Sequence, residues 1–96
     1  MAMMISVRVR AFARYRELFG ERFEVTVPAP ATVRDVVMAV EESNPRGMGE
    51  LLDSGGRVKP SVIVLVNRER VTGSHRDDHP VAGGDEVAIY PPVAGG

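Results

Sequence analysis

The 96-residue sequence contains no cysteine. This absence excludes disulfide bonds, thiolate metal sites, a catalytic thiol and transferable sulfur held on a cysteine side chain. No apolar run approaches the ~20 residues that a membrane-spanning helix needs. A signal-peptide core is also absent, because four arginines interrupt the apolar residues among the first twenty: Arg8, Arg10, Arg14 and Arg16. We therefore expect a cytoplasmic protein.

Charge and motifs exclude several further classes of function. The formal net charge of −1 provides no overall field that would attract nucleic acid or an anionic membrane. No Ser-His-Asp arrangement follows from the spacing, and no glycine-rich loop lies between a strand and a helix as phosphate binding requires. The segment His75–His79 is the only cluster of metal-ligand residue types in the sequence. Because Gly73 and Pro80 flank it and helical signals are missing, we favour a solvated loop over a metal site.

The four arginines named above raise the question of a basic patch near the first predicted strand. Three glutamates lie among or after them: Glu17, Glu21 and Glu24. This mixture of charges favours an ordinary solvated surface, with docking of a partner as the alternative.

The first part of the chain has the pattern of two strands joined by a helical turn. Apolar residues occupy alternate positions in Met3–Ala11 and again in Glu21–Val27, which is the period of a half-buried strand. Between them, Tyr15–Gly20 predicts a helical turn closed by its glycine. The short connection favours an antiparallel pair. We expect Pro28 and Pro30 to end the second strand.

One main helix is predicted to begin after Thr32. The threonine can cap the free amides, and Asp35 places negative charge where the helix dipole favours it. Asn44 and Pro45 mark the end of the helix. One apolar stripe at helical spacing predicts a buried face, despite the poor helix propensity of valine: Val33, Val36, Val37 and Val40.

The second half of the chain predicts three more strands. Val62–Val66 is apolar at every position, which is typical of a strand covered on both faces; the helix would cover one face, and a loop or a partner protein the other. A short strand around Val71, a long loop over 73–84 and a last strand over Glu86–Pro91 follow. Before them, Gly47–Leu52 is expected to form a short second helical turn.

These elements predict one α+β domain over residues 1–91. Their order is β-β-α, a short helical turn, then β-β-β. One main helix packed across one mixed sheet gives a two-layer architecture.

Residues 92–96 are expected to form a flexible C-terminal tail that ends in Gly95 and Gly96. Two prolines, Pro91 and Pro92, favour a stiff extended stalk before it. The tail can reach roughly 15–18 Å when fully extended, and its glycines can pass where side chains are excluded. The alternative is that the chain simply ends in loose glycines.

A carboxylate at the tip of such a tail has a specific chemistry. It is a poor electrophile until transfer of AMP from ATP neutralises its charge and supplies a leaving group. Attack by a sulfur nucleophile would then produce a thiocarboxylate, whereas attack by a lysine would produce an isopeptide bond. Both routes need an enzyme whose narrow cleft receives the tail, and glycine permits that approach.

Three stretches of the sequence resemble the MoaD/ThiS family of ubiquitin-like sulfur carriers. The C-terminal stretch Val87–Gly96, preceded by Gly83–Glu86, resembles the family signature and is closest to that of the small subunit of molybdopterin synthase. Phe12–Gly20 and Ala31–Asp35 are also similar to the family. The resemblance implies a ubiquitin-like β-grasp fold, in agreement with the element order.

The resemblance also implies a carrier that is not itself an enzyme and that binds no cofactor. An adenylating enzyme related to ubiquitin-activating enzymes would use ATP to activate Gly96, and a persulfide donor would convert it to a thiocarboxylate. The carrier would then dock on the large subunit of molybdopterin synthase and supply the sulfur of the dithiolene. We expect no partner among nucleic acids or membranes. The predicted partner-binding residues are four in the tail and two on the Val62–Val66 strand: Pro92, Val93, Ala94, Gly95, Ile63 and Leu65.

Three alternatives remain open from the sequence. The first is a ubiquitin-like modifier joined to lysines through the same Gly96, and the second is a sulfur carrier for another pathway such as thiamine thiazole synthesis. The stalk formed by Pro91, Pro92 and Val93 favours the molybdopterin type over the second. The third is a β-grasp interaction domain with an inert tail.

Overall fold

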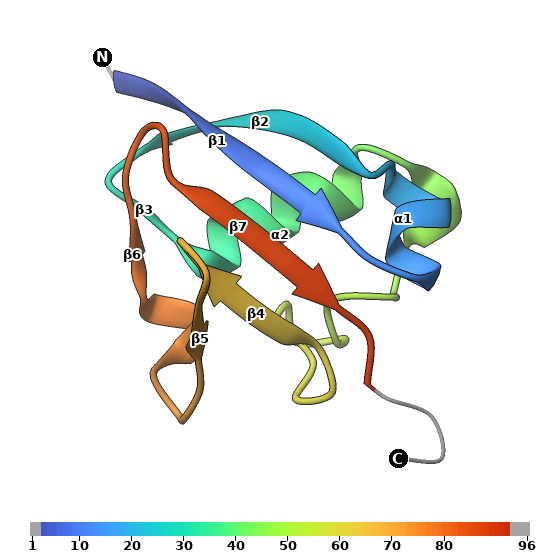
Figure 1. The fold of residues 1–96 in the computed structure, drawn as a ribbon. Coiled ribbons are helices and arrows are strands. Elements are labelled where there is room, and N and C mark those ends of the chain that lie inside the picture. Colours follow the sequence, from blue (N-terminus) through green and yellow to red (C-terminus); the bar gives the residue numbers. More distant parts are fainter. Residues whose placement is uncertain (1–2, 93–96) are drawn as a thin grey trace.

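A five-stranded mixed sheet with one main helix packed across it forms the body of the protein (Figure 1). The computed structural model describes residues 3–92. The strand order in the sheet is β2-β1-β7-β4-β5, and its strands are β1 (Met3–Ala11), β2 (Arg22–Ala29), β4 (Ile63–Val66), β5 (Glu69–Val71) and β7 (Glu86–Tyr90).

The remaining elements are short, apart from the main helix. A second, two-stranded sheet pairs β3 with β6. Its strands are β3 (Ala31–Thr32) and β6 (Pro80–Val81), and the helices are α1 (Arg14–Phe19), α2 (Val33–Glu42) and two 3₁₀ turns, η1 (Pro45–Gly47) and η2 (Arg76–Asp78). None of the helices within residues 3–92 is long and apolar enough to cross a membrane.

The first and last strands of the domain lie side by side in the middle of the sheet. β1 pairs with β2 in the antiparallel sense, which confirms the predicted antiparallel pair. On its other side β1 pairs with β7 in the parallel sense, with Val9 opposite Val87 and Ala11 opposite Ile89. All four of these side chains are at most 1% exposed, so the alternation seen in the sequence directs one residue in two into the core.

The main helix begins where the sequence predicts. The Thr32 hydroxyl accepts a hydrogen bond from the Asp35 amide at 3.3 Å, and the Asp35 carboxylate accepts one from the Thr32 amide at 2.9 Å. Two amides at the start of the helix are thereby satisfied reciprocally. The predicted stripe of four valines is fully buried against the sheet: Val33, Val36, Val37 and Val40.

Three predictions of detail are wrong. Pro28 does not end the second strand, because β2 continues to Ala29 as an edge strand, where proline is tolerated. The second helical turn occupies Pro45–Gly47 rather than Gly47–Leu52, with the Asn44 side chain accepting a hydrogen bond from the Arg46 amide at 3.1 Å. The segment 73–84 is not loop throughout, since it contains η2 and β6.

Candidate functional site

The face of the five-stranded sheet that points away from α2 carries the candidate site, and we call it the open face. Figure 1 is viewed onto this face, with α2 behind the sheet. Along β4, Val64 and Val66 are buried in the core, whereas Ile63 and Leu65 alternate with them and are partly exposed. The continuous apolar run in the sequence is therefore explained by a core on one side and the open face on the other.

An apolar strip crosses the open face near the end of β7. Leu65 lies opposite Ala88, and Ile63 lies opposite Tyr90, on the paired strands β4 and β7. The ring of Phe12 stacks on Tyr90 with a centroid separation of 4.1 Å and an interplanar angle of 4°. The apolar strip thus consists of Phe12, Ile63, Leu65, Ala88 and Tyr90.

The tail leaves the domain beside this strip. β7 ends at Tyr90, Pro91 is partly exposed and Pro92 is exposed. The end of β7 is fixed on both sides, because Ile63 pairs with Tyr90 and the Phe12 amide donates a hydrogen bond to the Ile89 carbonyl at 3.2 Å. The other predicted tail residues lie outside the described residues, so their roles remain predictions: Val93, Ala94, Gly95 and Gly96.

The structure brings together two of the predicted partner-binding residues, Ile63 and Leu65, and adds three that were not assigned to the site from the sequence. Phe12, Ala88 and Tyr90 complete the strip. The alternation of the last strand already indicated that Ala88 and Tyr90 face away from the core. No signal in the sequence indicated that Phe12, which follows β1, would stack on Tyr90.

The turn that leads into β7 is fixed by hydrogen bonds. The Asp85 carboxylate accepts a hydrogen bond from the Ala82 amide at 2.8 Å, and the Arg8 amide donates to the Asp85 carbonyl at 2.9 Å. The hydrogen bond from Ala82 lowers the pKa of Asp85, and the Asn67 side chain acts in the same direction. The strand that carries the tail therefore begins at a well-defined point.

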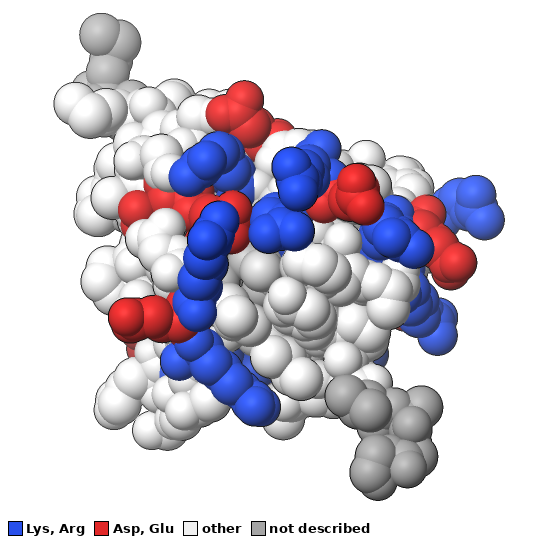
Figure 2. Space-filling view, viewed as in Figure 1, with Lys and Arg blue, Asp and Glu red and all other residues white. Residues whose placement is uncertain are grey.

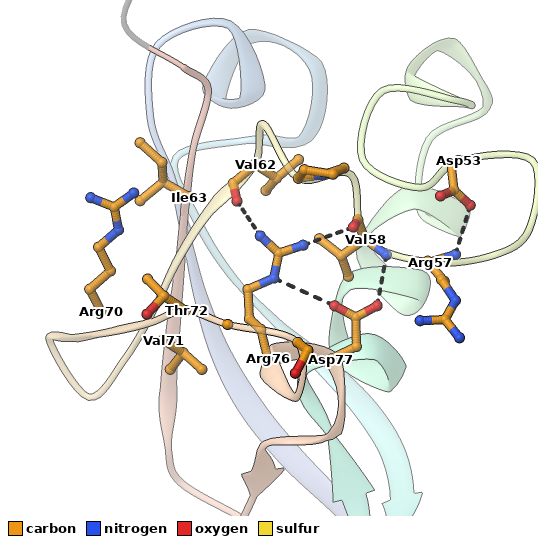
Figure 3. Close-up of a pocket in the computed structure, with 13 residues that line it drawn as sticks. Asp53, Arg57, Val58, Val62, Ile63, Arg70, Val71, Thr72, Arg76 and Asp77 are labelled. Atoms are coloured by element: carbon orange, nitrogen blue, oxygen red, sulfur yellow. Dashed lines mark hydrogen bonds and ion pairs between the residues drawn. The ribbon is translucent and has the colours of Figure 1, made fainter.

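Two side chains of the polar segment His75–His79 bind the backbone of another loop. We call these two, Arg76 and Asp77, the clamp. The guanidinium of Arg76 donates to the carbonyls of Val62 and Val58 at 2.8 Å each and to that of Lys59 at 3.1 Å. The Asp77 carboxylate accepts from the Val58 amide at 3.0 Å (Figure 3). These bonds fix the loop that leads into β4.

A depression of about 440 Å³ adjoins this clamp. The Arg76 donors that face it already bind backbone carbonyls and so are not available to a ligand. Within residues 3–92, no group of three or more histidine, cysteine or acidic side chains is placed to hold a metal ion.

Comparisons with known proteins agree with this architecture. The model of the ThiS family matches residues 9–96. Small archaeal modifier protein 3 of Haloferax volcanii is 38% identical over 95 residues, which cover 96% of this chain and 100% of that protein. A molybdopterin synthase sulfur carrier subunit of Pyrenophora tritici-repentis is 39% identical over 71 residues, which cover 73% of this chain and 69% of that protein.

A solved structure is similar over nearly the whole chain. The crystal structure of SAMP1 from Haloferax volcanii has a TM-score of 0.81 and 30% identity to this protein, and the match covers 95% of this chain and 99% of that one. The likeness confirms the predicted ubiquitin-like β-grasp fold, and the family match confirms the resemblance seen in the sequence. The chain belongs to the ThiS family of ubiquitin-like proteins.

Proposed function

We propose that this protein is a sulfur carrier of the molybdopterin synthase type, which receives and donates sulfur at Gly96. The observation that carries the proposal is the position of the apolar strip, at the end of the open face from which the tail leaves. A partner that covers the strip would hold the tail at its own active site. The similarity to a molybdopterin synthase sulfur carrier subunit supports this choice of pathway, as does the Pro91-Pro92-Val93 stalk.

The proposed chemistry takes place entirely at the terminal carboxylate. The Gly96 carboxylate attacks the α-phosphate of ATP in the activating enzyme, and pyrophosphate leaves. The terminal sulfur of a persulfide then attacks the acyl adenylate and displaces AMP, which gives an acyl disulfide. A second thiol cleaves its S–S bond, so that the thiocarboxylate is released and a disulfide forms on the donor side. The carrier contributes no side-chain thiol, since it contains no cysteine.

The open face is proposed to dock first the adenylating enzyme and then the large synthase subunit. Both enzymes must receive the same tail, so both are expected to cover the same apolar strip. Ile63 and Leu65 are the residues whose partly exposed side chains we assign to this contact. Apolar side chains grouped on one surface are typical of such interfaces.

A ubiquitin-like modifier is the second candidate function. It is supported by the 38% identity to small archaeal modifier protein 3. A modifier would use the same activated Gly96 but would transfer the acyl group to a lysine of a target protein. A ladder of thiol-resistant conjugates on denaturing gels of the host proteome would identify this activity.

Mass spectrometry of the intact protein tests the carrier proposal. Incubation with the activating enzyme, ATP and a persulfide donor should replace one terminal oxygen by sulfur, and the change should localise to the C-terminal peptide. A variant lacking Gly96 should remain folded and show no such change. Sulfur on an internal residue, or full sulfur transfer by the truncated variant, would contradict the proposal.

A further inference from the structure

Four arginines border a single depression of about 550 Å³ on the open face, at the end of β7 opposite the tail. Arg8 lies opposite Glu86, the first residue of β7, whereas the tail follows the last residue, Tyr90. Figure 2 shows blue side chains, interspersed with red ones, above a broad white area on this face. We call the four the arginine cluster: Arg8, Arg10, Arg22 and Arg68.

Two members of the cluster are held in an unfavourable arrangement. Arg10 of β1 lies directly opposite Arg22 of β2, and like charges in such cross-strand pairs are destabilising. Arg10 is partly buried, and its guanidinium carbon lies 5.1 Å from the centroid of the Phe12 ring. Its Nε atom is buried without a hydrogen-bond partner, which also costs free energy. The fold therefore holds one buried arginine donor without a partner, beside a pair of like charges.

Residues 3–92 do not neutralise the arginine cluster by ion pairs. The salt bridges of this part of the chain involve Arg14, Arg16 and Arg76 instead. Two glutamates border the depression, but Glu24 accepts a hydrogen bond from the Ser6 hydroxyl at 2.8 Å, and neither Glu24 nor Glu86 lies within ion-pair distance of an arginine of the cluster. Within the cluster, the Arg8 guanidinium donates one hydrogen bond, to the Gly84 carbonyl at 3.2 Å.

We propose that the arginine cluster binds an acidic segment of the enzyme that activates the tail. A guanidinium offers planar pairs of donors that match a carboxylate, so carboxylates placed between Arg10 and Arg22 would offset their repulsion. The cluster adjoins the apolar strip through Arg10, which contacts Phe12 of the strip. One partner surface can therefore cover both, with its apolar part near the tail and its acidic part farther away.

The charges around the depression favour a protein partner over a nucleic acid. Glu24 and Glu86 line the depression together with the four arginines, and the whole chain has a formal net charge of −1. A phosphate backbone needs an extended basic surface, and these glutamates would repel it. A protein segment can place its carboxylates on the arginines alone.

A titration followed by NMR tests, without any enzyme, whether the arginine cluster binds acidic peptides. The ¹⁵N-labelled full chain is titrated with a hexaglutamate peptide, a hexaglutamine peptide and a single-stranded RNA hexamer. We expect the glutamate peptide to shift the amide and side-chain Nε signals of Arg10 and Arg22, and the glutamine peptide to leave them unchanged. No shift with the glutamate peptide, or larger shifts of the same signals with RNA, would overturn the proposal.

Substitutions test whether the glutamate peptide binds at the arginine cluster. Arg22→Gln and Arg68→Gln change exposed side chains, so both should fold, and each should reduce the shifts caused by the glutamate peptide several-fold. Arg46→Gln removes another exposed arginine, from η1 and outside the depression, and should bind like the unmodified protein. Equal binding by all three variants would contradict a specific site.

The role in activation rests on the proposed function and is tested separately. In an assay of ATP–pyrophosphate exchange with the host's activating enzyme, Arg22→Gln should raise the KM for the carrier about tenfold and leave kcat unchanged, because docking charges affect association. Its KM should also depend less on salt concentration. An unchanged KM would refute this role. If the unmodified protein supported no exchange at all, the proposed function would fail. The peptide titration would still show whether the arginine cluster binds acidic segments.

Discussion

Arg10 and Arg22 lie directly opposite each other on the antiparallel strands β1 and β2, and no carboxylate of residues 3–92 forms an ion pair with either. A protein that carries such a pair gives up some stability in its free state. The retained charge is then available to a partner. This relation between stability and binding can be measured with one substitution.

Arg22→Glu should stabilise the free protein and weaken its docking. Because the substitution replaces a repulsive cross-strand pair by an attractive one, the free energy of unfolding should rise by about 0.5–1 kcal/mol. Urea denaturation at low salt measures the change, and the gain should shrink at about 1 M salt, where charges are screened within about 3 Å. Arg46→Glu is the control and should change stability by less than about 0.5 kcal/mol. A loss of stability in Arg22→Glu would show that the pair is not repulsive.

Leu65→Glu should disrupt docking without unfolding the domain. Leu65 is partly exposed on the apolar strip, so a carboxylate there remains hydrated in the free protein but would be buried against a partner at a cost of several kcal/mol. Binding to the large synthase subunit, measured by calorimetry, should fall at least tenfold. The exposed Thr26 on β2, outside the strip, provides the control variant Thr26→Glu. Normal binding by Leu65→Glu would place the docking surface elsewhere.

Gly95→Val should obstruct activation and leave the melting temperature unchanged. The substituted residue follows the exposed Pro92 and would have to pass a narrow channel, where a branched side chain is excluded. The rate of adenylation is measured by pyrophosphate release, with Ala94→Gly as a control that adds no bulk. Adenylation of Gly95→Val at the normal rate would show that no narrow passage exists.

Stability should fall in alkaline solution because of Tyr15. Burial raises the pKa of Tyr15, the carboxylate of Glu50 adds to the effect, and Arg14 opposes it. Since the folded pKa lies above the unfolded value of about 10, the neutral phenol stabilises the fold below about pH 10, and this contribution is lost as the pH rises through the folded pKa. Urea unfolding of the protein and of Tyr15→Phe at increasing pH measures the loss. An identical decline in Tyr15→Phe would assign the effect to other groups.

Periodic patterns in the sequence predicted the main elements because each rests on local geometry. The alternation in β1 and β7 and the valine stripe of α2 report directly which side chains face the core. The capping box of Thr32 and Asp35 is likewise local, since its partners are three residues apart. These features need no knowledge of the rest of the fold.

Long-range hydrogen bonds left no such pattern. Glu41, at the end of the helix, is only 5% exposed, because its carboxylate accepts from the amides of Leu51 and Leu52 at 2.9 Å each. The clamp made by Arg76 joins residues 14 to 18 positions apart. The partners in these bonds are separated by distances along the chain that follow no helical or strand period. The conformations of the polar loops could therefore not be predicted from the sequence.

The parallel pairing of β1 with β7 determines how the domain responds to force. The chain enters at the start of β1 and leaves toward the tail at the end of β7, at opposite ends of this pair (Figure 1). A pull on the tail against the N-terminal end would load the hydrogen bonds between the two strands in shear, so that several must break together. Resistance of this kind is governed by the rate of unfolding. A partner that drew on the tail would therefore load β7 along its length against β1, and the hydrogen bonds between these two strands would share the force.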